Sequence, residues 1–229
     1  MTKLLSWYPP EILQLYPAGA TLKWYNAFIT NSYFHVLKQE VLPMRKNFGA
    51  KPYTYPQPVL IIASFDENGI PDAMNAAWGG ISDDTQISLC LSAGHKTVKN
   101  ILKKKAFTVS MAVASQVTAC DYVGIVSGND VPDKLAKAGF HTTKSDFVDA
   151  PLIDELPMAL ECSLVSYDEE SCRMVGEIVN VSADENVLDE NGKIDPMKLQ
   201  PITFDPVNNT YLKLGEKAGD AFRDGLKLK

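Results

Sequence analysis

The spacing of apolar and polar residues along the chain predicts a mainly β protein. Residues 58–65 form a run rich in β-branched side chains, and Asp-Glu-Asn-Gly, a strong hairpin-turn signal, follows at once. Apolar and polar residues then alternate, as they do in half-buried strands, in four further segments. These segments are 86–92, 106–114, 157–167 and 172–183. The last two flank a polar turn and therefore predict one long hairpin.

Apolar stripes at helical spacing predict short helices between these strands. They cover residues 97–105, 115–126 and 131–140, and the last of them has a proline near its first turn and Gly139 at its end. Residues 70–78 are interpreted as a strand or an extended loop that the glycine pair 79–80 breaks, and residues 201–215 as a proline-broken loop followed by a short strand. Consecutive hairpins with a few short helices favour an antiparallel barrel with helical insertions over a doubly wound sheet.

Composition and charge narrow the class of protein. The chain has 229 residues, of which 45% are hydrophobic and 22% charged, and this fits one globular domain with a sizeable core. The formal net charge is −6, so bulk electrostatics do not favour nucleic acid or an anionic membrane as a partner. The sequence contains no run of 18 apolar residues and no basic lead with an apolar core behind it. We therefore expect neither a membrane span nor a secretory signal.

The cysteines predict a cytoplasmic protein without a metal site. No C-x-x-C pair is present among the four cysteines, which are Cys90, Cys120, Cys162 and Cys172. The three histidines are scattered along the chain. The thiols are interpreted as reduced cysteines that mostly fill the core.

Residues 1–43 differ in composition from the rest of the chain. They carry five of the 50 charged residues but eight of the 21 aromatic ones. One interpretation is a real N-terminal extension whose aromatic side chains pack on the domain or on a partner. The other is upstream sequence read in frame, with Met44 as the natural start. No chemistry is expected before Met44.

The stretch Leu91–Ile101, LSAGHKTVKNI, joins a predicted strand to a predicted helix through a tight elbow. Thr97 stands where an N-cap residue belongs. The turn before it is crowded with small, polar and basic residues, namely Ser92, Gly94, His95 and Lys96. A helix start offers free N–H groups and a positive dipole end, so the elbow has the properties of an anion site, most often one for phosphate. The alternative is an ordinary capped helix with a solvated lysine.

Seven segments in this order resemble the flavin reductase-like, flavoredoxin-type family. They are PVLIIASFDENGIPDAMNAAWGG (58–80), LSAGHKTVKNI (91–101), FTVSMA (107–112), ACDYVGIVSG (119–128), PDKLAKAGF (132–140), APLIDELPMALEC (150–162) and VGEIVNVSADE (175–185). The resemblance covers residues 44–214 and places a flavin reductase-like FMN-binding domain at 44–229. It implies a six-stranded antiparallel Greek-key split barrel, a homodimer, and FMN bound near the subunit interface.

The resemblance also implies what the elbow binds. The FMN phosphate would lie there, and the family's basic-then-threonine pattern falls on Lys96 and Thr97, with Ser92 beside them. The family often has arginine where this chain has His95 or Lys96. Lysine still binds phosphate as a point charge, but it lacks the planar fork of arginine. Asn100 lies one turn into the helix, where it either reaches the phosphate or faces solvent.

The segment MNAAWGG resembles the wall of a flavin-ring slot. Such a slot needs little side-chain bulk and close backbone groups. Ala76 and Ala77 supply small walls, Asn75 a polar contact, and Trp78 a broad apolar face. The alternative for Trp78 is a core plug at the end of a strand.

Two further cofactor contacts follow from the resemblance. Lys134 matches a lysine that contacts the flavin, where an ammonium would stabilise the reduced anion. The alternative is a solvated helix lysine, like Lys137 one turn later. Phe204 falls where the family places an aromatic ring over the cofactor. The family often has a histidine shortly before VGE, but this chain has Ser-Cys-Arg at 171–173, and that puts any flavin contact from this strand in doubt.

Two functions from different classes are consistent with the sequence. No nucleophile with a paired base is visible, so the cofactor would carry the chemistry. The first hypothesis is an FMN-dependent oxidoreductase that moves electrons from NAD(P)H through FMN to a small acceptor. The alternative is a flavoredoxin-like electron carrier that receives electrons from a redox protein. No motif distinguishes these hypotheses, or NADH from NADPH, because nicotinamide docks on the flavin face without a readable signature.

Overall fold

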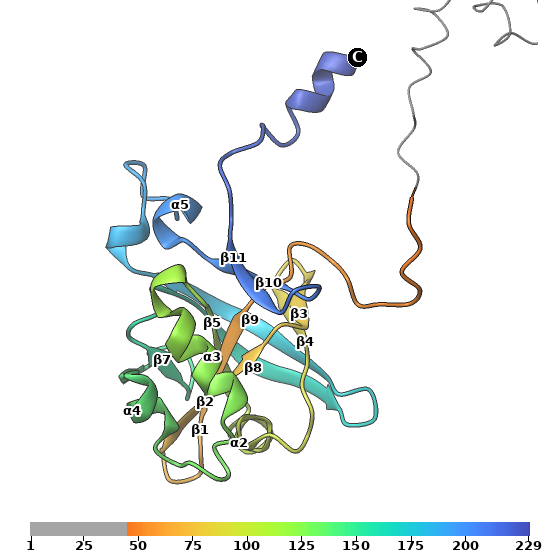
Figure 1. Cartoon of the computed structure of the whole chain (residues 1–229). Coiled ribbons are helices and arrows are strands. Elements are labelled where there is room, and N and C mark those ends of the chain that lie inside the picture. The colour runs from red at the N-terminus through yellow and green to blue at the C-terminus, as the bar shows by residue number, and fades with distance from the viewer. Residues whose placement is uncertain (1–44) are drawn as a thin grey trace, which may run out of the picture. The chain divides into compact units, whose positions relative to one another are not determined.

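An antiparallel sheet of seven strands forms the centre of the computed structural model, which describes residues 45–229 (Figure 1). The expectations for residues 1–43 and for Met44 lie outside the described residues. The strand order is β2-β1-β5-β8-β9-β4-β3. The strands are β1 (Leu60–Phe65), β2 (Pro71–Ala76), β3 (Gly79–Asp83), β4 (Gln86–Cys90), β5 (Ala106–Met111), β8 (Met158–Asp168) and β9 (Arg173–Ala183). The predicted mainly β class with helical insertions is confirmed, with seven strands in this sheet where six were expected.

Short helices and two small sheets complete the described structure. The α-helices are α2 (Lys96–Lys104), α3 (Val117–Ile125), α4 (Lys134–Ala138) and α5 (Pro196–Leu199). The 3₁₀ helices are η2 (Ala114–Gln116), η3 (Glu185–Val187) and η4 (Asp224–Leu228). The two-stranded sheets are β6 (Thr142–Lys144) with β7 (Pro151–Ile153), and β10 (Ile202–Asp205) with β11 (Thr210–Lys213).

Strand β1 is buried on both faces, which explains its unbroken apolar run. Ile61 and Ala63 point into one core, together with residues of α3 and α4. Leu60 and Ile62 point into a second core, which α2 and strands β4, β5, β8 and β9 enclose. A strand between two cores needs no polar face, so alternation is absent here.

The long hairpin of β8 and β9 curls the sheet around the second core. Each strand has 11 residues, and the pairing shifts register after Glu161 and again after Leu164. Such bulges bend a strand and increase its twist. The predicted hairpin is therefore confirmed, and its irregularities bring β9 beside β4.

The β1–β2 turn follows the sequence signal closely. Asp66 Oδ1 accepts hydrogen bonds from the backbone N–H groups of Asn68 and Ile70, at 2.9 and 2.8 Å. Gly69 has a φ of +80°, a conformation that glycine adopts without strain. Asp-Glu-Asn-Gly thus fixes the register in which Phe65 pairs with Pro71.

Two segments differ from their predictions. The glycine pair after Trp78, expected to be a break, instead begins β3. Gly79 pairs with Leu89 of the neighbouring strand and lies so close to it that a side chain would collide. Residues 202–205, expected to be part of a loop, pair with 210–213 as the hairpin β10–β11. Pro201 and Pro206 flank the first of these strands, so neither proline removes a donor from the paired segment.

We expect Gly176→Ala to destabilise the protein by about 1–3 kcal/mol, the usual cost of overpacking a core. A Cβ atom at Gly176 would lie 2.4 Å from Cζ of Phe107, which is fully buried and has no room to move. Gly80→Ala is the matched control, because a Cβ there meets nothing within 4 Å. Guanidinium unfolding followed by circular dichroism measures both variants. Equal stability of the two would contradict the close contact.

Candidate functional site

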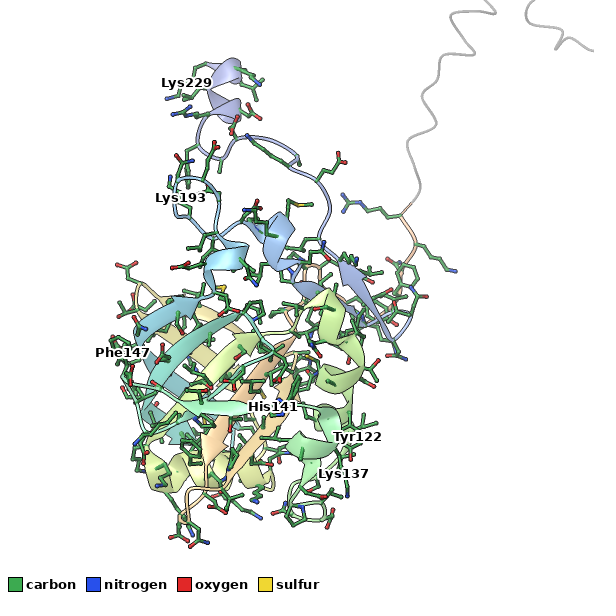
Figure 2. The ribbon with its side chains drawn as sticks, turned by 90° about the vertical axis from the view of Figure 1, so that its left-hand side faces the viewer. Tyr122, Lys137, His141, Phe147, Lys193 and Lys229 are labelled. Atoms are coloured by element: carbon green, nitrogen blue, oxygen red, sulfur yellow. The ribbon has the colours of Figure 1, made fainter. Side chains whose placement is uncertain are left out.

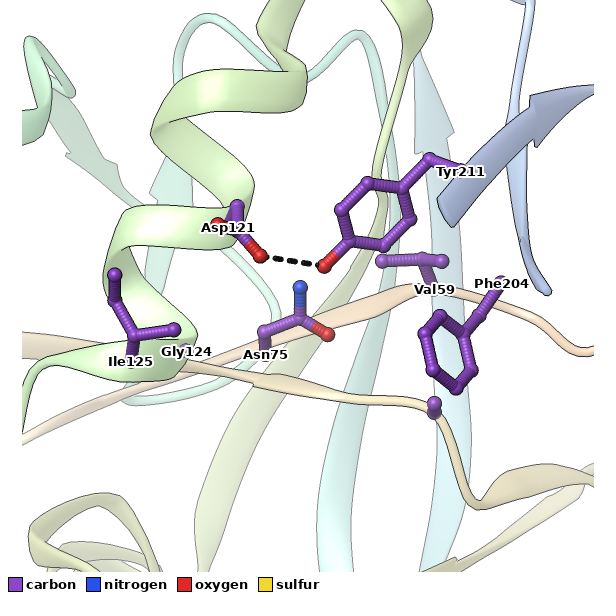
Figure 3. A pocket seen from close by; sticks show the side chains of 8 residues that line it. Val59, Asn75, Asp121, Gly124, Ile125, Phe204 and Tyr211 are labelled. Carbon is purple, nitrogen blue, oxygen red and sulfur yellow. Dashed lines mark hydrogen bonds between the residues drawn. The ribbon is translucent and has the colours of Figure 1, made fainter. Parts of the chain in front are cut away.

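A pocket of about 260 Å³ opens where the end of β2, helix α3 and the β10–β11 hairpin meet (Figure 3). Its lining residues are Val59, Asn75, Ala77, Asp121, Gly124, Ile125, Phe204 and Tyr211. They come from four separate stretches of the chain, so the pocket exists only in the folded protein. Three of the predicted site residues, Asn75, Ala77 and Phe204, meet in it.

One side of the pocket is apolar and partly aromatic. Val59 and Ala77 supply aliphatic surface here and Phe204 supplies a ring, while Ile125 adds aliphatic surface from α3 across the pocket (Figure 3). The Phe204 and Tyr211 rings pack against each other, with centroids 6.1 Å apart and planes tilted by 54°. Tilted packing at this distance is favourable and holds both rings in place. This side of the pocket suits a flat, largely apolar ligand.

The other side of the pocket is polar. The Tyr211 hydroxyl donates a 2.7 Å hydrogen bond to Asp121 Oδ1, and the Asn75 side chain lies just below this bond (Figure 3). Asn75 Nδ2 donates to the carbonyl of Cys120 at 3.1 Å. Burial, together with the bond to Asp121, raises the pKa of Tyr211 to about 12. Tyr211 therefore keeps its proton at neutral pH and remains a donor to Asp121.

Gly124 allows α3 to lie against β2 at this site. A Cβ atom at position 124 would be 2.7 Å from Cβ of Asn75, which is closer than real Cβ atoms approach. Only glycine permits the observed approach of the helix to the strand. Residues 121, 124 and 125 are spaced i, i+3 and i+4, so this packing turns one face of α3 toward the pocket.

The elbow residues lie elsewhere, at the start of α2. The helix begins at Lys96 with His95 as N-cap, so the prediction of Thr97 as the N-cap is wrong. Thr97 is in the first turn, is only 1% exposed, and its hydroxyl donates to Asp72 Oδ2 at 2.6 Å. The reason is helical phase, which points this side chain at β2 and away from the turn. Ser92 and His95 are exposed and Lys96 is half-buried.

Lys134 is buried in an ion pair with the same carboxylate. Its ammonium lies 3.2 Å from Asp72 Oδ1, and both side chains are 3% exposed. It also donates to the carbonyls of Val126 and Val123, at 3.3 and 3.5 Å. The solvated-lysine alternative is therefore wrong for Lys134, although it holds for Lys137, which is exposed (Figure 2). A contact between Lys134 and a flavin stays a prediction.

The remaining predicted site residues are partly buried in the protein and partly exposed. Asn100 is buried, so the solvent-facing alternative is wrong, and its Nδ2 has no hydrogen-bond partner among residues 45–229. Ala76 is buried in the second core. Trp78 is 57% exposed, so the core-plug alternative is wrong as well.

The elbow residues and the pocket residues lie toward opposite ends of β2. Asp72, which contacts the elbow helix through Thr97, is five residues before Ala77, which lines the pocket. At about 3.3 Å per residue, extended chain puts roughly 16 Å between them. An elongated ligand with an anionic end and a flat end matches this separation.

Sequence reasoning missed Asp121 and Tyr211, the polar residues of the pocket that contact each other. Asp121 was only part of a predicted helix, and Tyr211 only part of a predicted strand. They are 90 residues apart, and no local pattern announces a pair that only the fold brings together. For α3, the one available signal was the helical spacing of residues 121, 124 and 125, which puts them on one face of the helix.

The fold and the pocket together define a class of protein, an antiparallel curled sheet with a partly aromatic ligand pocket beside it. The chain matches the flavin reductase like domain family over residues 53–205. The chain belongs to this family. A search among curated proteins gave no match.

Solved structures of similar proteins agree with this assignment. The flavoredoxin of Desulfovibrio vulgaris (Miyazaki F) is 35% identical, with a TM-score of 0.76, over 80% of this chain and 100% of that one. The flavoredoxin from Methanosarcina acetivorans is 25% identical, with a TM-score of 0.73, over 81% of this chain and 100% of that one. An FMN-binding domain of a flavin reductases-like enzyme from Shewanella baltica OS155 shares the fold, with a TM-score of 0.64 at 19% identity, over 72% of this chain and 89% of that one.

Proposed function

We propose that this protein is an FMN-binding oxidoreductase that moves electrons from NAD(P)H through FMN to a small acceptor. The observation that carries the proposal is the pocket in which Asn75, Ala77 and Phe204 meet, at the far end of β2 from the basic elbow. FMN is the cofactor supported by membership of the flavin reductase-like family and by the likeness to the FMN-binding domain from Shewanella baltica.

The residues present fit FMN at both ends. Val59, Ile125 and Phe204 give the pocket the apolar and aromatic surface that an isoalloxazine ring requires. At the elbow, the first turn of α2 contains no acidic residue, and Lys96 forms no ion pair within residues 45–229. The first N–H groups of a helix have no partner within it, so the elbow offers donors to a phosphate.

When bound, FMN supplies hydride and electron transfer, and the chain supplies binding and orientation. Phe204 and Val59 would hold the ring by packing, and the side-chain oxygen of Asn75 would be the amide atom left to face the ring edge. Lys96 and His95 hold the phosphate. The apolar lining reduces the access of water to the ring, which protects a reduced cofactor from side reactions.

The Asp72 carboxylate has a supporting role in this proposal. It accepts from Thr97 on α2 and from Lys134 on α4, so it ties both helices to β2. Thr97 and Lys134 thereby set the position of the elbow whether or not they touch the cofactor.

Flavoredoxin-like electron transfer without NAD(P)H activity is the second candidate. The specific observation in its favour is the 35% identity to the Desulfovibrio vulgaris flavoredoxin over that protein's whole length. A redox protein would then be the electron donor. A cytoplasmic location stays a prediction from the cysteines.

One experiment decides between these functions. The purified protein is loaded with FMN, freed of excess cofactor and mixed with NADH or NADPH under nitrogen. The oxidoreductase bleaches the flavin absorbance promptly, whereas the carrier bleaches only with dithionite. A protein that stays colourless after incubation with FMN would exclude both functions.

The proposed function also includes the formation of a homodimer. Large apolar side chains are exposed on and beside the strands β3, β8 and β9, namely Trp78, Ile81, Val165, Val179 and Val181. Large apolar side chains that stay exposed on a sheet are typical of an interface. A second copy of the chain would cover them, and it would complete the surroundings of FMN near the interface.

We expect Ile81→Glu to shift the protein from dimer to monomer, because Ile81 is 66% exposed on the edge strand β3 and a buried charge there would oppose association. Ile70→Glu, at an exposed position in the β1–β2 turn, is the control and should leave the dimer intact. Light scattering after size exclusion gives the masses. A wild-type mass equal to one chain would refute the dimer.

No helix in the described part of the chain is long and apolar enough to cross a membrane.

A further inference from the structure

Asp121 is the charged residue of the pocket, and it has hydrogen-bonding capacity to spare. Its Oδ1 accepts the Tyr211 hydroxyl at 2.7 Å. Within residues 45–229, no donor reaches its Oδ2 and no lysine, arginine or histidine forms an ion pair with it. Asp121 is only partly exposed, so it is a carboxylate at the pocket wall with one oxygen available.

The donors next to Asp121 are already engaged inside the protein. Tyr211 gives its proton to Asp121, and the raised pKa of Tyr211 means that this proton stays in place. Asn75 donates from Nδ2 to the Cys120 carbonyl, and its amide also hydrogen-bonds the Tyr211 hydroxyl. The polar side of the pocket therefore presents an acceptor to whatever binds there, and a ligand that donates a hydrogen bond at this point is favoured.

The fold holds Asp121 firmly in this position. Gly124, one turn later, lets α3 approach β2 so closely that a Cβ would be 2.7 Å from Asn75. Tyr211, from β11, fixes the carboxylate from the opposite side (Figure 3). A carboxylate fixed from two sides loses little conformational entropy when a ligand binds, so its hydrogen bond is more selective.

We propose that Asp121 is a specificity-determining residue, held in place by Tyr211, which accepts a hydrogen bond from the imide N–H of the flavin ring. This inference rests on the proposed function, which places the ring in this pocket. The imide edge of the isoalloxazine carries one N–H between two carbonyl groups, and it is the donor on the ring that a carboxylate at a pocket wall would select. The apolar residues Val59, Ile125 and Phe204 would then face the rest of the ring.

The test compares FMN with an FMN analogue that carries a methyl group on the imide nitrogen. Wild type should bind FMN roughly 10- to 100-fold more tightly than the analogue, the range expected for a hydrogen bond to a charged group. Asp121→Asn is nearly the same size, keeps an oxygen for Tyr211 and turns an NH₂ group toward the ligand. In this variant the FMN affinity should fall until the ratio of the affinities for FMN and for the methylated analogue is close to one.

A matched control and a second variant keep the test decisive. Glu190→Gln removes the same charge from an exposed turn and should leave the ratio at the wild-type value. If Asp121→Asn fails to give a cooperative thermal melt, Asp121→Ala replaces it, with the same expected loss of preference. Fluorescence quenching of the flavin on binding supplies the affinities without any turnover.

Three outcomes would overturn the inference, and they differ in what else they overturn. Equal affinities of wild type for FMN and the analogue would remove the hydrogen bond but leave FMN binding intact. An unchanged ratio in Asp121→Asn would mean that the methyl group is excluded by size alone, since asparagine occupies the same space. Failure of wild type to bind FMN at all would refute the proposed function, and this inference with it.

Discussion

Lys134→Met is expected to destabilise the protein by about 3–5 kcal/mol, the usual consequence of removing one partner of a buried ion pair. Lys134 and Asp72 are each only 3% exposed, so the variant would leave the Asp72 carboxylate in the interior without its cation. Asp72 would keep only its hydrogen bond from Thr97. Methionine keeps most of the bulk of the lysine side chain, so the loss of stability comes from the missing charge rather than from a cavity.

Lys137→Met is the matched control. Lys137 is on the same short helix, but it is exposed and pairs with an exposed Asp133 at 3.0 Å. Exposed pairs of this kind contribute little, so the control should unfold at the wild-type denaturant concentration. Urea or guanidinium unfolding at neutral pH, with unchanged m-values, measures the difference.

The double variant Lys134→Met with Asp72→Asn gives a further check. Replacing the carboxylate by a neutral amide removes the uncompensated charge, so the double variant should be more stable than Lys134→Met alone. If Lys134→Met behaves like Lys137→Met, the ion pair is not shielded from water as described, and Lys134 would be free to contact a ligand.

The sequence predicted most of the fold because the signals were local. The apolar run of β1 and its Asp-Glu-Asn-Gly turn, and the alternation in β8 and β9, each report on neighbours within a few residues. The strands that were missed have weak local signals. Gly79 and Gly80 looked like a break, and the strand between Pro201 and Pro206 is only four residues long.

The candidate site was predictable only in part, for a different physical reason. Asn75 and Phe204 were named through the family resemblance, and the fold does bring them into one pocket. The direction of a side chain on a short helix depends on a phase of 100° per residue, and a boundary error of one or two residues turns Thr97 from the elbow to Asp72. The solvated-lysine alternative for Lys134 stayed open because the burial of a lysine depends on a carboxylate 62 residues away in the sequence.

Lys96→Ala is expected to weaken FMN binding about 10- to 100-fold and to leave riboflavin binding unchanged. A charge-assisted hydrogen bond is typically worth about 1.5–3 kcal/mol, and riboflavin has no phosphate with which to form it. Lys96 is the first residue of α2, so its positive charge belongs to the turn that carries the free N–H groups of the helix start. Titration of the apo-protein with each ligand gives the two affinities.

Lys99→Ala is the control for charge, because Lys99 is exposed on the same helix but beyond its first turn. It should change neither affinity, since the dipole and the free N–H groups act only at the helix start.

Thr97→Val separates direct phosphate binding from support of the elbow. Its hydroxyl already donates to Asp72, so its loss should lower stability while FMN and riboflavin affinities change together. A selective loss of FMN in Thr97→Val would instead mean that the hydroxyl leaves Asp72 to bind phosphate. Equal losses of FMN and riboflavin in Lys96→Ala would remove the phosphate from the elbow altogether.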